Sequence, residues 1–258
     1  MRYASNILGL IGSTPLVRIN KLNPNPNVEM YAKLEGLNPG GSVKDRICIR
    51  MVEEAEKAGI LTRDKVILEP TSGNTEIGLA MIAAVKGYRC LLVIPASVSL
   101  ERVLMLKAFG ADVLLTPADQ GSDGAIIKAR EMLESNPDLY VMLDQFNDPA
   151  NPRAHYETTG PEIWRDTDGR ITHLVAGLGT TGTLMGAGRY LKERKSSVKL
   201  VAVEPEPGHR IQGLKNLSEA IVPGIYDESL IDMKVVVRTE EAYKWAAKLT
   251  REEEIFLS

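Results

Sequence analysis

Short apolar runs typical of β-strands alternate, from about residue 28 onward, with stretches whose apolar residues recur every three or four positions. This alternation is the signature of parallel α/β architecture, because a helix carries the chain back before the next parallel strand begins. We predict strands at residues 28–34, 66–69, 90–94, 113–116, 140–143, 173–176 and 200–203. We predict helices at residues 43–58, 75–86, 100–109, 124–133 and 183–192, and glycines end three of them, at Gly59, Gly87 and Gly110.

A dense cluster of turn residues, from Asn147 to Pro152, interrupts this alternation. A series of strand-and-helix steps precedes the cluster, and another helix is expected to start near Arg153. The cluster is therefore the expected crossing between two domains, at residues 1–146 and 147–258. No internal repeat is present, which excludes a solenoid.

Composition excludes several classes of protein. The 258 residues carry 31 basic and 34 acidic side chains, a net charge of −3, so no global basic field favours nucleic acid or an anionic membrane. The longest apolar run, residues 79–85, is far below the roughly 20 residues that span a bilayer. No secretory leader is recognisable, so we expect a cytoplasmic protein.

Cysteine and histidine usage gives little support to disulfides or metal sites. Cys48 and Cys90 have no metal-like spacing and are expected to be reduced core residues. His155, His173 and His209 lie far apart in sequence, and none belongs to a two-histidine helical pair. We therefore expect no metal site.

Lys44 stands in the first turn of a predicted helix, after the glycine turn of Asn38-Pro39-Gly40-Gly41-Ser42. Ser42 and Asp45 have the spacing of a capping box. The positive end of the helix dipole disfavours an ammonium group there, which makes Lys44 a better nucleophile toward an aldehyde. A Schiff base of this kind holds pyridoxal phosphate. A solvated lysine on an exposed turn explains this motif alone equally well.

Two further loops follow predicted strands and open helices, as anion-binding loops do. Backbone N–H groups and hydroxyls converge in the first, Glu69-Pro70-Thr71-Ser72-Gly73-Asn74-Thr75, which would suit a carboxylate. An ordinary turn rich in capping residues is the alternative. The second loop is Gly177-Leu178-Gly179-Thr180-Thr181-Gly182-Thr183, whose glycines allow the backbone to close around a phosphate.

A dinucleotide is the competing ligand for the second loop. Gly177, Gly179 and Gly182 satisfy G-x-G-x-x-G, and Glu204 follows at a distance that suits contact with a ribose. A nicotinamide cofactor would leave Lys44 and the first loop unexplained. Pyridoxal phosphate accounts for all three motifs.

Together these motifs resemble the fold-type II pyridoxal-phosphate family, and within it the cysteine synthases. Matching runs cover most of the chain: residues 11–17, 38–46, 69–75, 145–152, 158–163 and 177–186. The phosphate loop followed by Leu184-Met185-Gly186 is similar to the branch that prefers O-phosphoserine. The resemblance implies two three-layer α/β/α domains with mostly parallel sheets, as in the tryptophan synthase β subunit, with residues near 13–34 packed on the second domain.

The resemblance also implies roles for individual residues. Lys44 would form the Schiff base and remove the substrate's α-proton, and Asn74 would bond the 3′-oxygen of the cofactor. The amino-acid carboxylate would be held by Thr71, Ser72, Thr75 and Gln145. The cofactor phosphate would be bound by Gly179, Thr180, Thr181, Gly182 and Thr183. Lys215 stands where the O-phosphoserine branch has a basic residue, and it would bind a substrate phosphate unless it is a solvated surface lysine.

The implied reaction is a β-replacement that makes L-cysteine through an aminoacrylate intermediate. The amino-acid donor would be O-phosphoserine or O-acetylserine, and the sulfur donor would be sulfide or a thiocarboxylated carrier protein. A homodimer is implied, together with a possible serine acetyltransferase tail as partner. Cystathionine formation from serine, or an impaired paralogue that acts through a partner, are alternatives.

Two departures from the family pattern bear on function. Glu76 replaces the glycine that follows the residue matched by Thr75, and its charge is expected to weaken binding of a carboxylate nearby. The family pattern also continues beyond residue 258 with a loop whose serine faces the pyridine nitrogen. Support of the ring nitrogen is therefore not expected from these residues.

Overall fold

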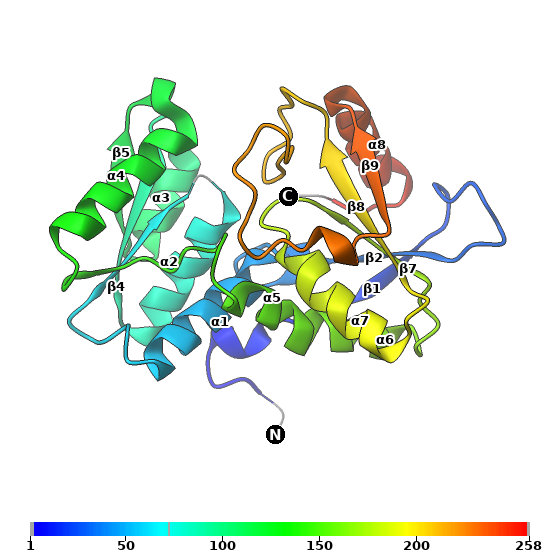
Figure 1. Cartoon of the computed structure of the whole chain (residues 1–258), viewed down its shortest axis with the longest axis horizontal. Helices are drawn as coiled ribbons and strands as arrows, with labels where there is room; N and C mark the ends of the chain where they lie inside the picture. The colour runs from blue at the N-terminus through cyan, green and yellow to red at the C-terminus, as the bar shows by residue number, and fades with distance from the viewer. Residues whose placement is uncertain (1–2, 72, 257–258) are drawn as a thin grey trace.

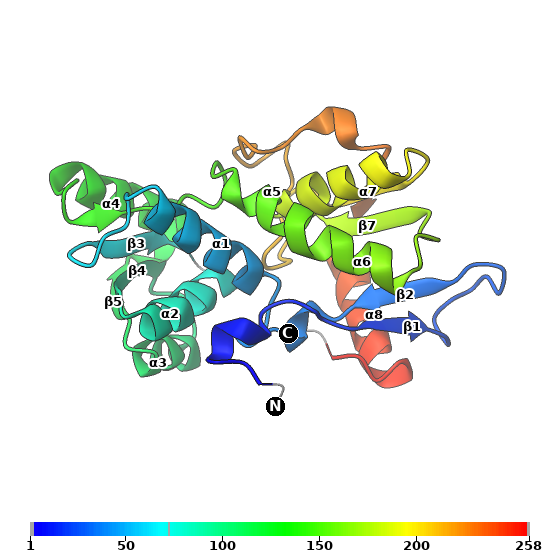
Figure 2. The ribbon, with the colours of Figure 1, turned by 90° about the horizontal axis from the view of Figure 1, so that it is seen from below.

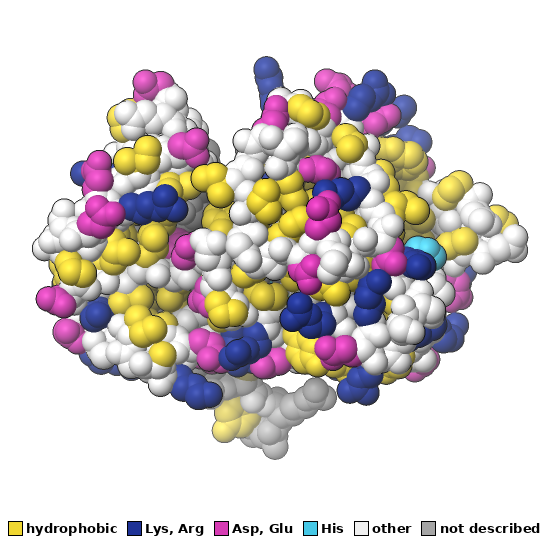
Figure 3. All heavy atoms as spheres, viewed as in Figure 1, with side chains coloured by type: hydrophobic (Ala, Val, Ile, Leu, Met, Phe, Trp, Pro, Cys, Tyr) yellow, Lys and Arg dark blue, Asp and Glu magenta, His cyan; other side chains and the backbone are white. Residues whose placement is uncertain are grey.

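The computed structural model describes residues 3–71 and 73–256, which form two lobes, each built around a parallel sheet (Figure 1). A small antiparallel hairpin of β1 (Leu16–Ile19) and β2 (Met30–Lys33) completes the fold. The surface is indented between the two lobes, and acidic and basic side chains are interspersed over the face seen in Figure 3. Within the described residues, no helix is both long enough and apolar enough to span a membrane.

The first sheet has the order β5-β4-β3-β6 and is parallel throughout. Its strands are β3 (Val66–Pro70), β4 (Arg89–Pro95), β5 (Asp112–Thr116) and β6 (Tyr140–Val141). Helices α1 (Lys44–Lys57), α2 (Asn74–Lys86), α3 (Leu100–Ala108) and α4 (Gly121–Ser135) connect or precede them. Successive strand residues point to opposite faces, so Ile67 packs with the α1 and α2 core whereas Leu68 packs with α4. The result is a three-layer lobe.

The second sheet has the order β7-β8-β9 and is also parallel. Its strands are β7 (His173–Gly177), β8 (Lys199–Pro205) and β9 (Met233–Val237). Before it come α5 (Ala150–Ala154), a π-helical turn (His155–Thr159) and α6 (Gly160–Asp166). A second π-helical turn (Leu184–Gly188) leads into α7 (Arg189–Arg194), and α8 (Thr239–Glu252) follows β9. Ile163, Leu184 and Leu200 share the core of this lobe.

The hairpin lies beside the second lobe (Figure 2), and polar contacts join the two. The Lys33 ammonium lies 2.8 Å from the Glu162 carboxylate, and the backbone N–H of Ser13 donates to the same carboxylate over 2.9 Å. At the other end of the hairpin, the backbone N–H of Leu22 donates to Glu253 over 2.6 Å. We propose that the domains are residues 1–146 and 147–258, with residues 13–34 packed on the second.

The prediction of an α/β fold with mostly parallel sheets is confirmed, and strands or helices occupy every range named from the sequence. The predicted helix at residues 183–192 differs in detail, because its first turn is π-helical. Strands β1 and β9 and helix α8 were not predicted from the sequence. The apolar run Met233–Val237 and the spacing of Tyr243, Ala246 and Leu249 were available as signals for β9 and α8.

Candidate active site

Hydrogen bonds bring the two predicted anion-binding loops together. The Thr75 hydroxyl, at the start of α2, donates to Oε1 of Gln145 over 2.8 Å. Asn151 on α5 donates from Nδ2 to the backbone carbonyl of Gln145, over 2.7 Å, and to the Thr180 hydroxyl, over 3.1 Å. A continuous set of polar contacts therefore joins the loop after β3 to the loop after β7.

Lys44 is the first residue of α1, as predicted, and its side chain is half-buried. Burial lowers the pKa of the Lys44 ammonium, and the charge of a Cys48 thiolate would oppose that shift. The sequence predicted an effect of the helix dipole, but burial is the chief cause of the lowered Lys44 pKa. A lysine that loses its proton more easily is a better nucleophile and base.

The predicted capping box at the start of α1 is wrong. The Ser42 hydroxyl accepts from the backbone N–H of Lys44 over 3.1 Å, and Asp45 accepts from the N–H of Gly40 over 2.5 Å. The left-handed backbone of Gly41, at a φ of 82°, folds the preceding turn back, so the N–H within reach of Asp45 is that of Gly40. Burial raises the pKa of Asp45 to about 6.

The loop after β3 holds the residues expected to bind a carboxylate. Thr71 is buried, and its hydroxyl accepts from the N–H of Gly73 over 3.4 Å. Asn74 begins α2 and is half-buried, and Ser72 lies outside the described residues. Because the Thr75 hydroxyl donates to the Gln145 amide oxygen, the Gln145 NH2 group is left to donate elsewhere. Thr75 thus orients Gln145.

The loop after β7 meets the requirements of a phosphate site. Thr181 has a φ of 71°, and its buried hydroxyl has no hydrogen-bond partner among the described residues. A Cβ at Gly179 would lie 2.5 Å from the Gly213 carbonyl oxygen, so only glycine fits there. An unpartnered buried hydroxyl in a glycine loop that opens a helix fits an anion such as the phosphate of pyridoxal phosphate.

Lys215 lies across from this loop and is not a fully solvated surface lysine. Its backbone N–H donates to the Leu178 carbonyl over 2.7 Å, and its ammonium stands 4.1 Å from the centre of the Phe146 ring. Burial lowers the pKa of the Lys215 ammonium. The Lys215 side chain therefore reaches from the second lobe toward Phe146, the residue that follows Gln145.

Three buried residues around the loops were missed as site residues. Asn151 is fully buried. His155 bonds the Thr159 hydroxyl over 2.9 Å and the Thr183 hydroxyl over 3.3 Å, and burial lowers its pKa to about 3, so the imidazole is neutral. Glu69 is buried with its carboxylate accepting from the N–H of Leu143 over 3.3 Å, and burial raises its pKa to about 8. Polar residues in a turn cluster were the only sequence signal for Asn151.

Glu76 is completely buried next to Thr75. Its Oε1 lies 3.2 Å from Nη1 of Arg102 on α3, and Oε2 has no partner among the described residues. Burial raises the pKa of Glu76 to about 7, and the Arg102 guanidinium opposes this rise. When ionised, the Glu76 carboxylate therefore places a negative charge next to the Arg102 guanidinium, beside the carboxylate loop.

Glu76→Gln and Glu76→Gly should tighten binding of an amino-acid carboxylate, because either change removes a negative charge from beside the carboxylate loop. A unit charge within about 10 Å at an effective dielectric of about 20 contributes about 1–2 kcal/mol, or roughly 5- to 30-fold in affinity. The dissociation constant of O-acetylserine, measured by fluorescence titration of each variant, checks this. An unchanged or weaker affinity in both variants would contradict it.

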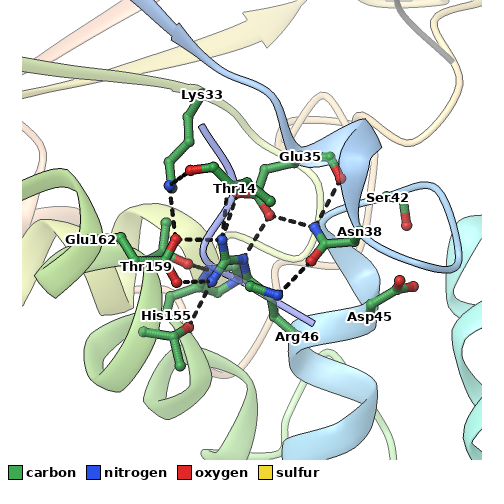
Figure 4. A network of polar contacts seen from close by, with 12 residues as sticks. Thr14, Lys33, Glu35, Asn38, Ser42, Asp45, Arg46, His155, Thr159 and Glu162 are labelled. Carbon is green, nitrogen blue, oxygen red and sulfur yellow. Dashed lines mark hydrogen bonds and ion pairs between the residues drawn. The ribbon is translucent and has the colours of Figure 1, made fainter. Parts of the chain in front are cut away.

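A buried ion network is centred on Arg46, which follows Lys44 by two residues on α1 (Figure 4). Arg46, only 2% exposed, contacts Glu35 over 2.7 Å through Nε and Glu162 over 2.7 Å through Nη1. Burial alone would raise the pKa of Glu162, but hydrogen bonds from Arg46 and Lys33 outweigh it and lower the value to about 2. The network joins α1, the segment after the hairpin, and α6.

Comparison with known proteins gives a consistent result. A family model described as pyridoxal-phosphate dependent enzyme matches residues 7–258. The cysteine synthase of Aquifex aeolicus is 49% identical over 255 residues, covering 97% of this chain and 78% of that protein. Cysteine synthase B of Escherichia coli is 46% identical over 246 residues, covering 95% of this chain and 80% of that protein.

Solved structures agree with these relatives. The cysteine synthase from Entamoeba histolytica superposes with a TM-score of 0.94 at 38% identity, covering 98% of this chain and 78% of that one. A hydrogen sulfide-producing enzyme from Fusobacterium nucleatum gives a TM-score of 0.92 at 40% identity, with coverage of 99% and 86%.

Proposed function

The chain belongs to the pyridoxal-phosphate dependent enzymes, and from that premise we propose that it is a cysteine synthase, a transferase that makes L-cysteine by β-replacement. The observation that carries the proposal is the joining of a carboxylate loop and a phosphate loop through Gln145, Asn151 and Thr180, in a chain whose α1 begins at Lys44. Relatives named cysteine synthase, at 44–49% identity, support the same reaction.

The cofactor would be held by residues from both lobes. Lys44 and Asn74 come from the first lobe, and the phosphate would be bound by Gly179, Thr180, Thr181, Gly182 and Thr183. The unpartnered Thr181 hydroxyl and the glycine required at position 179 support this fit. When bound, pyridoxal phosphate withdraws electrons from the α-carbon of an attached amino acid, which eases loss of the α-proton and of the β-substituent.

The protein's own contribution begins with orientation. Thr71, Ser72 and Gln145 would bind the substrate carboxylate, and Thr75 would hold the Gln145 amide with its NH2 group toward that carboxylate. His155, neutral at physiological pH, would fix the Thr183 hydroxyl. Rigid donors of this kind keep the reacting bond aligned with the base.

Lys44 would take the α-proton on Nζ and would later return a proton to the product. Its pKa is lowered by burial, so a larger fraction of Nζ is free to accept a proton at neutral pH. Both lobes surround the site, and their closure would keep water from the reactive product of elimination.

The amino-acid donor is proposed to be O-phosphoserine or O-acetylserine, with sulfide or a thiocarboxylated carrier protein as the sulfur donor. Cysteine formation from each pair, measured with purified protein supplied with pyridoxal phosphate, tests the proposal. The proposal would be wrong if the protein instead made cystathionine from serine and homocysteine. It would also be wrong if the protein bound the cofactor but made no product. The homodimer, the serine acetyltransferase tail and the cytoplasmic location stay predictions.

Lys215→Met should lower kcat/KM for O-phosphoserine by about 10-fold or more, because a charge-assisted hydrogen bond to phosphate contributes about 1.5–3 kcal/mol. Methionine keeps an apolar chain over Phe146, so the loop should keep its position. The kcat/KM for O-acetylserine, which has no phosphate, serves as the internal control. Equal losses with both substrates would assign Lys215 to structure instead.

A further inference from the structure

The Asn151 side chain lies between the two anion-binding loops. It is 0% exposed, and it is carried by α5, which begins at Ala150, within the turn cluster predicted at residues 147–152. Its single Nδ2 atom has two hydrogens, and both are used: one for the Gln145 carbonyl at 2.7 Å and one for the Thr180 hydroxyl at 3.1 Å. No other amide or hydroxyl side chain of this size could serve both acceptors from one atom.

On the side of Gln145, the contact fixes a segment that is already held at several points. Glu69, at the end of β3, accepts from the N–H of Leu143, and the Gln145 side chain accepts from Thr75. The bond from Asn151 to the Gln145 carbonyl closes this set of contacts. The amide that would face the substrate carboxylate is thereby tied to α5.

On the side of Thr180, the bond determines what the hydroxyl can do. A threonine hydroxyl has one hydrogen and can accept through its lone pairs. Because Asn151 donates to Thr180 Oγ1, the hydroxyl hydrogen of Thr180 stays available for an anion. The hydrogen bond from Asn151 therefore leaves the Thr180 hydroxyl as a hydrogen-bond donor toward a phosphate.

The remaining atom of the amide, Oδ1, supports a role beyond packing. It is buried without a hydrogen-bond partner among the described residues, and leaving a buried polar atom unpaired is unfavourable. It also lies so close to Gly182 that a Cβ there would collide with it. The fold thus tolerates an unpaired oxygen and requires a glycine in the phosphate loop in order to keep this amide.

We propose that Asn151 is a positioning residue that couples the carboxylate loop to the phosphate loop, so that cofactor binding through Thr180 organises Gln145 for the amino acid. This inference rests on the proposed function of both loops. It predicts that loss of the Asn151 amide weakens binding at both loops.

The test compares Asn151→Ala, Thr180→Val and the double variant. Affinity for pyridoxal phosphate is measured by equilibrium dialysis of the cofactor-free protein, and affinity of the cofactor-loaded protein for O-acetylserine by fluorescence titration. Asn151→Ala should weaken both affinities by about 3- to 10-fold, the size expected for one or two neutral hydrogen bonds. In the double variant, the loss of cofactor affinity should be smaller than the product of the two single losses, because both changes remove the same contact.

Val198→Ala is the matched control, because Val198 is a fully buried core residue of the same lobe and belongs to neither loop. It should lower Tm without changing either affinity. The proposal is overturned if Asn151→Ala only lowers Tm as the control does, or if only one of the two affinities falls. Wild-type protein that binds both ligands but makes no cysteine would refute the proposed function and leave this comparison intact.

Discussion

Lys44→Ala is expected to lower cysteine formation by about 10²- to 10⁴-fold, the range over which a positioned base contributes to a proton transfer. Asp45, the next residue, is not placed to replace the lost Nζ, because its carboxylate accepts from the backbone N–H of Gly40. The rate of cysteine formation at saturating cofactor measures the loss. Pyridoxal phosphate should also bind more weakly.

The fold should survive this change, because the Lys44 side chain is half-buried and alanine favours a helix. Lys57→Ala, at the last residue of the same helix, is the control and should keep full activity. If Lys44→Ala retained a tenth or more of the wild-type rate, Lys44 would not be the base.

Arg46→Met should cost about 3–5 kcal/mol of unfolding free energy, because it leaves the buried carboxylates of Glu35 and Glu162 without their shared guanidinium. For a chain of this size, that loss corresponds to a Tm lower by roughly 6–20 °C. Differential scanning calorimetry of the cofactor-free protein checks the shift.

Arg50→Met provides the comparison from the next turn of α1. Arg50 pairs with Glu54 and Glu157 at the surface, and such pairs contribute about 0–1 kcal/mol. Similar losses of unfolding free energy in Arg46→Met and Arg50→Met would contradict the prediction, because the buried network would then stabilise the fold no more than a surface pair.

The same network makes stability depend on acid. The pKa of Glu162 is about 2 in the folded protein against an ordinary value of 4.5, so its contribution is complete above pH 4.5 and is lost as the pH falls toward 2. In Glu162→Gln, this part of the acid dependence should disappear.

The elements that the sequence predicted are those determined by local patterns. Residues 75–86 and 90–94 show helical and strand periodicity in the chain itself, and the loops after β3 and β7 contain their glycines and hydroxyls in consecutive positions. These features need no knowledge of distant residues. The same holds for Lys44, whose place in the first helical turn follows from the preceding glycines.

The contacts that were not predicted join residues far apart in sequence. Asn151 contacts Thr180 across 29 positions, and Glu76 contacts Arg102 across 26. The contact between the Lys215 ammonium and the ring of Phe146 was not predicted either, and binding of a substrate phosphate by Lys215 stays a prediction. Such partners depend on how the lobes and helices pack, which periodicity does not encode. The roles given to the individual site residues remain predictions.

The bond between Arg46 and Glu162 spans 116 positions of the chain, and this separation has a consequence for synthesis on the ribosome. The first lobe emerges with the guanidinium of α1 still lacking one of its two carboxylates, in a region that excludes water in the finished protein. The helix that starts at Lys44 therefore reaches its final stability only after α6 has been translated. Until then Lys44 stands on a helix that lacks part of its stabilising contacts. Its capacity to form a Schiff base with an aldehyde should therefore arise late in translation.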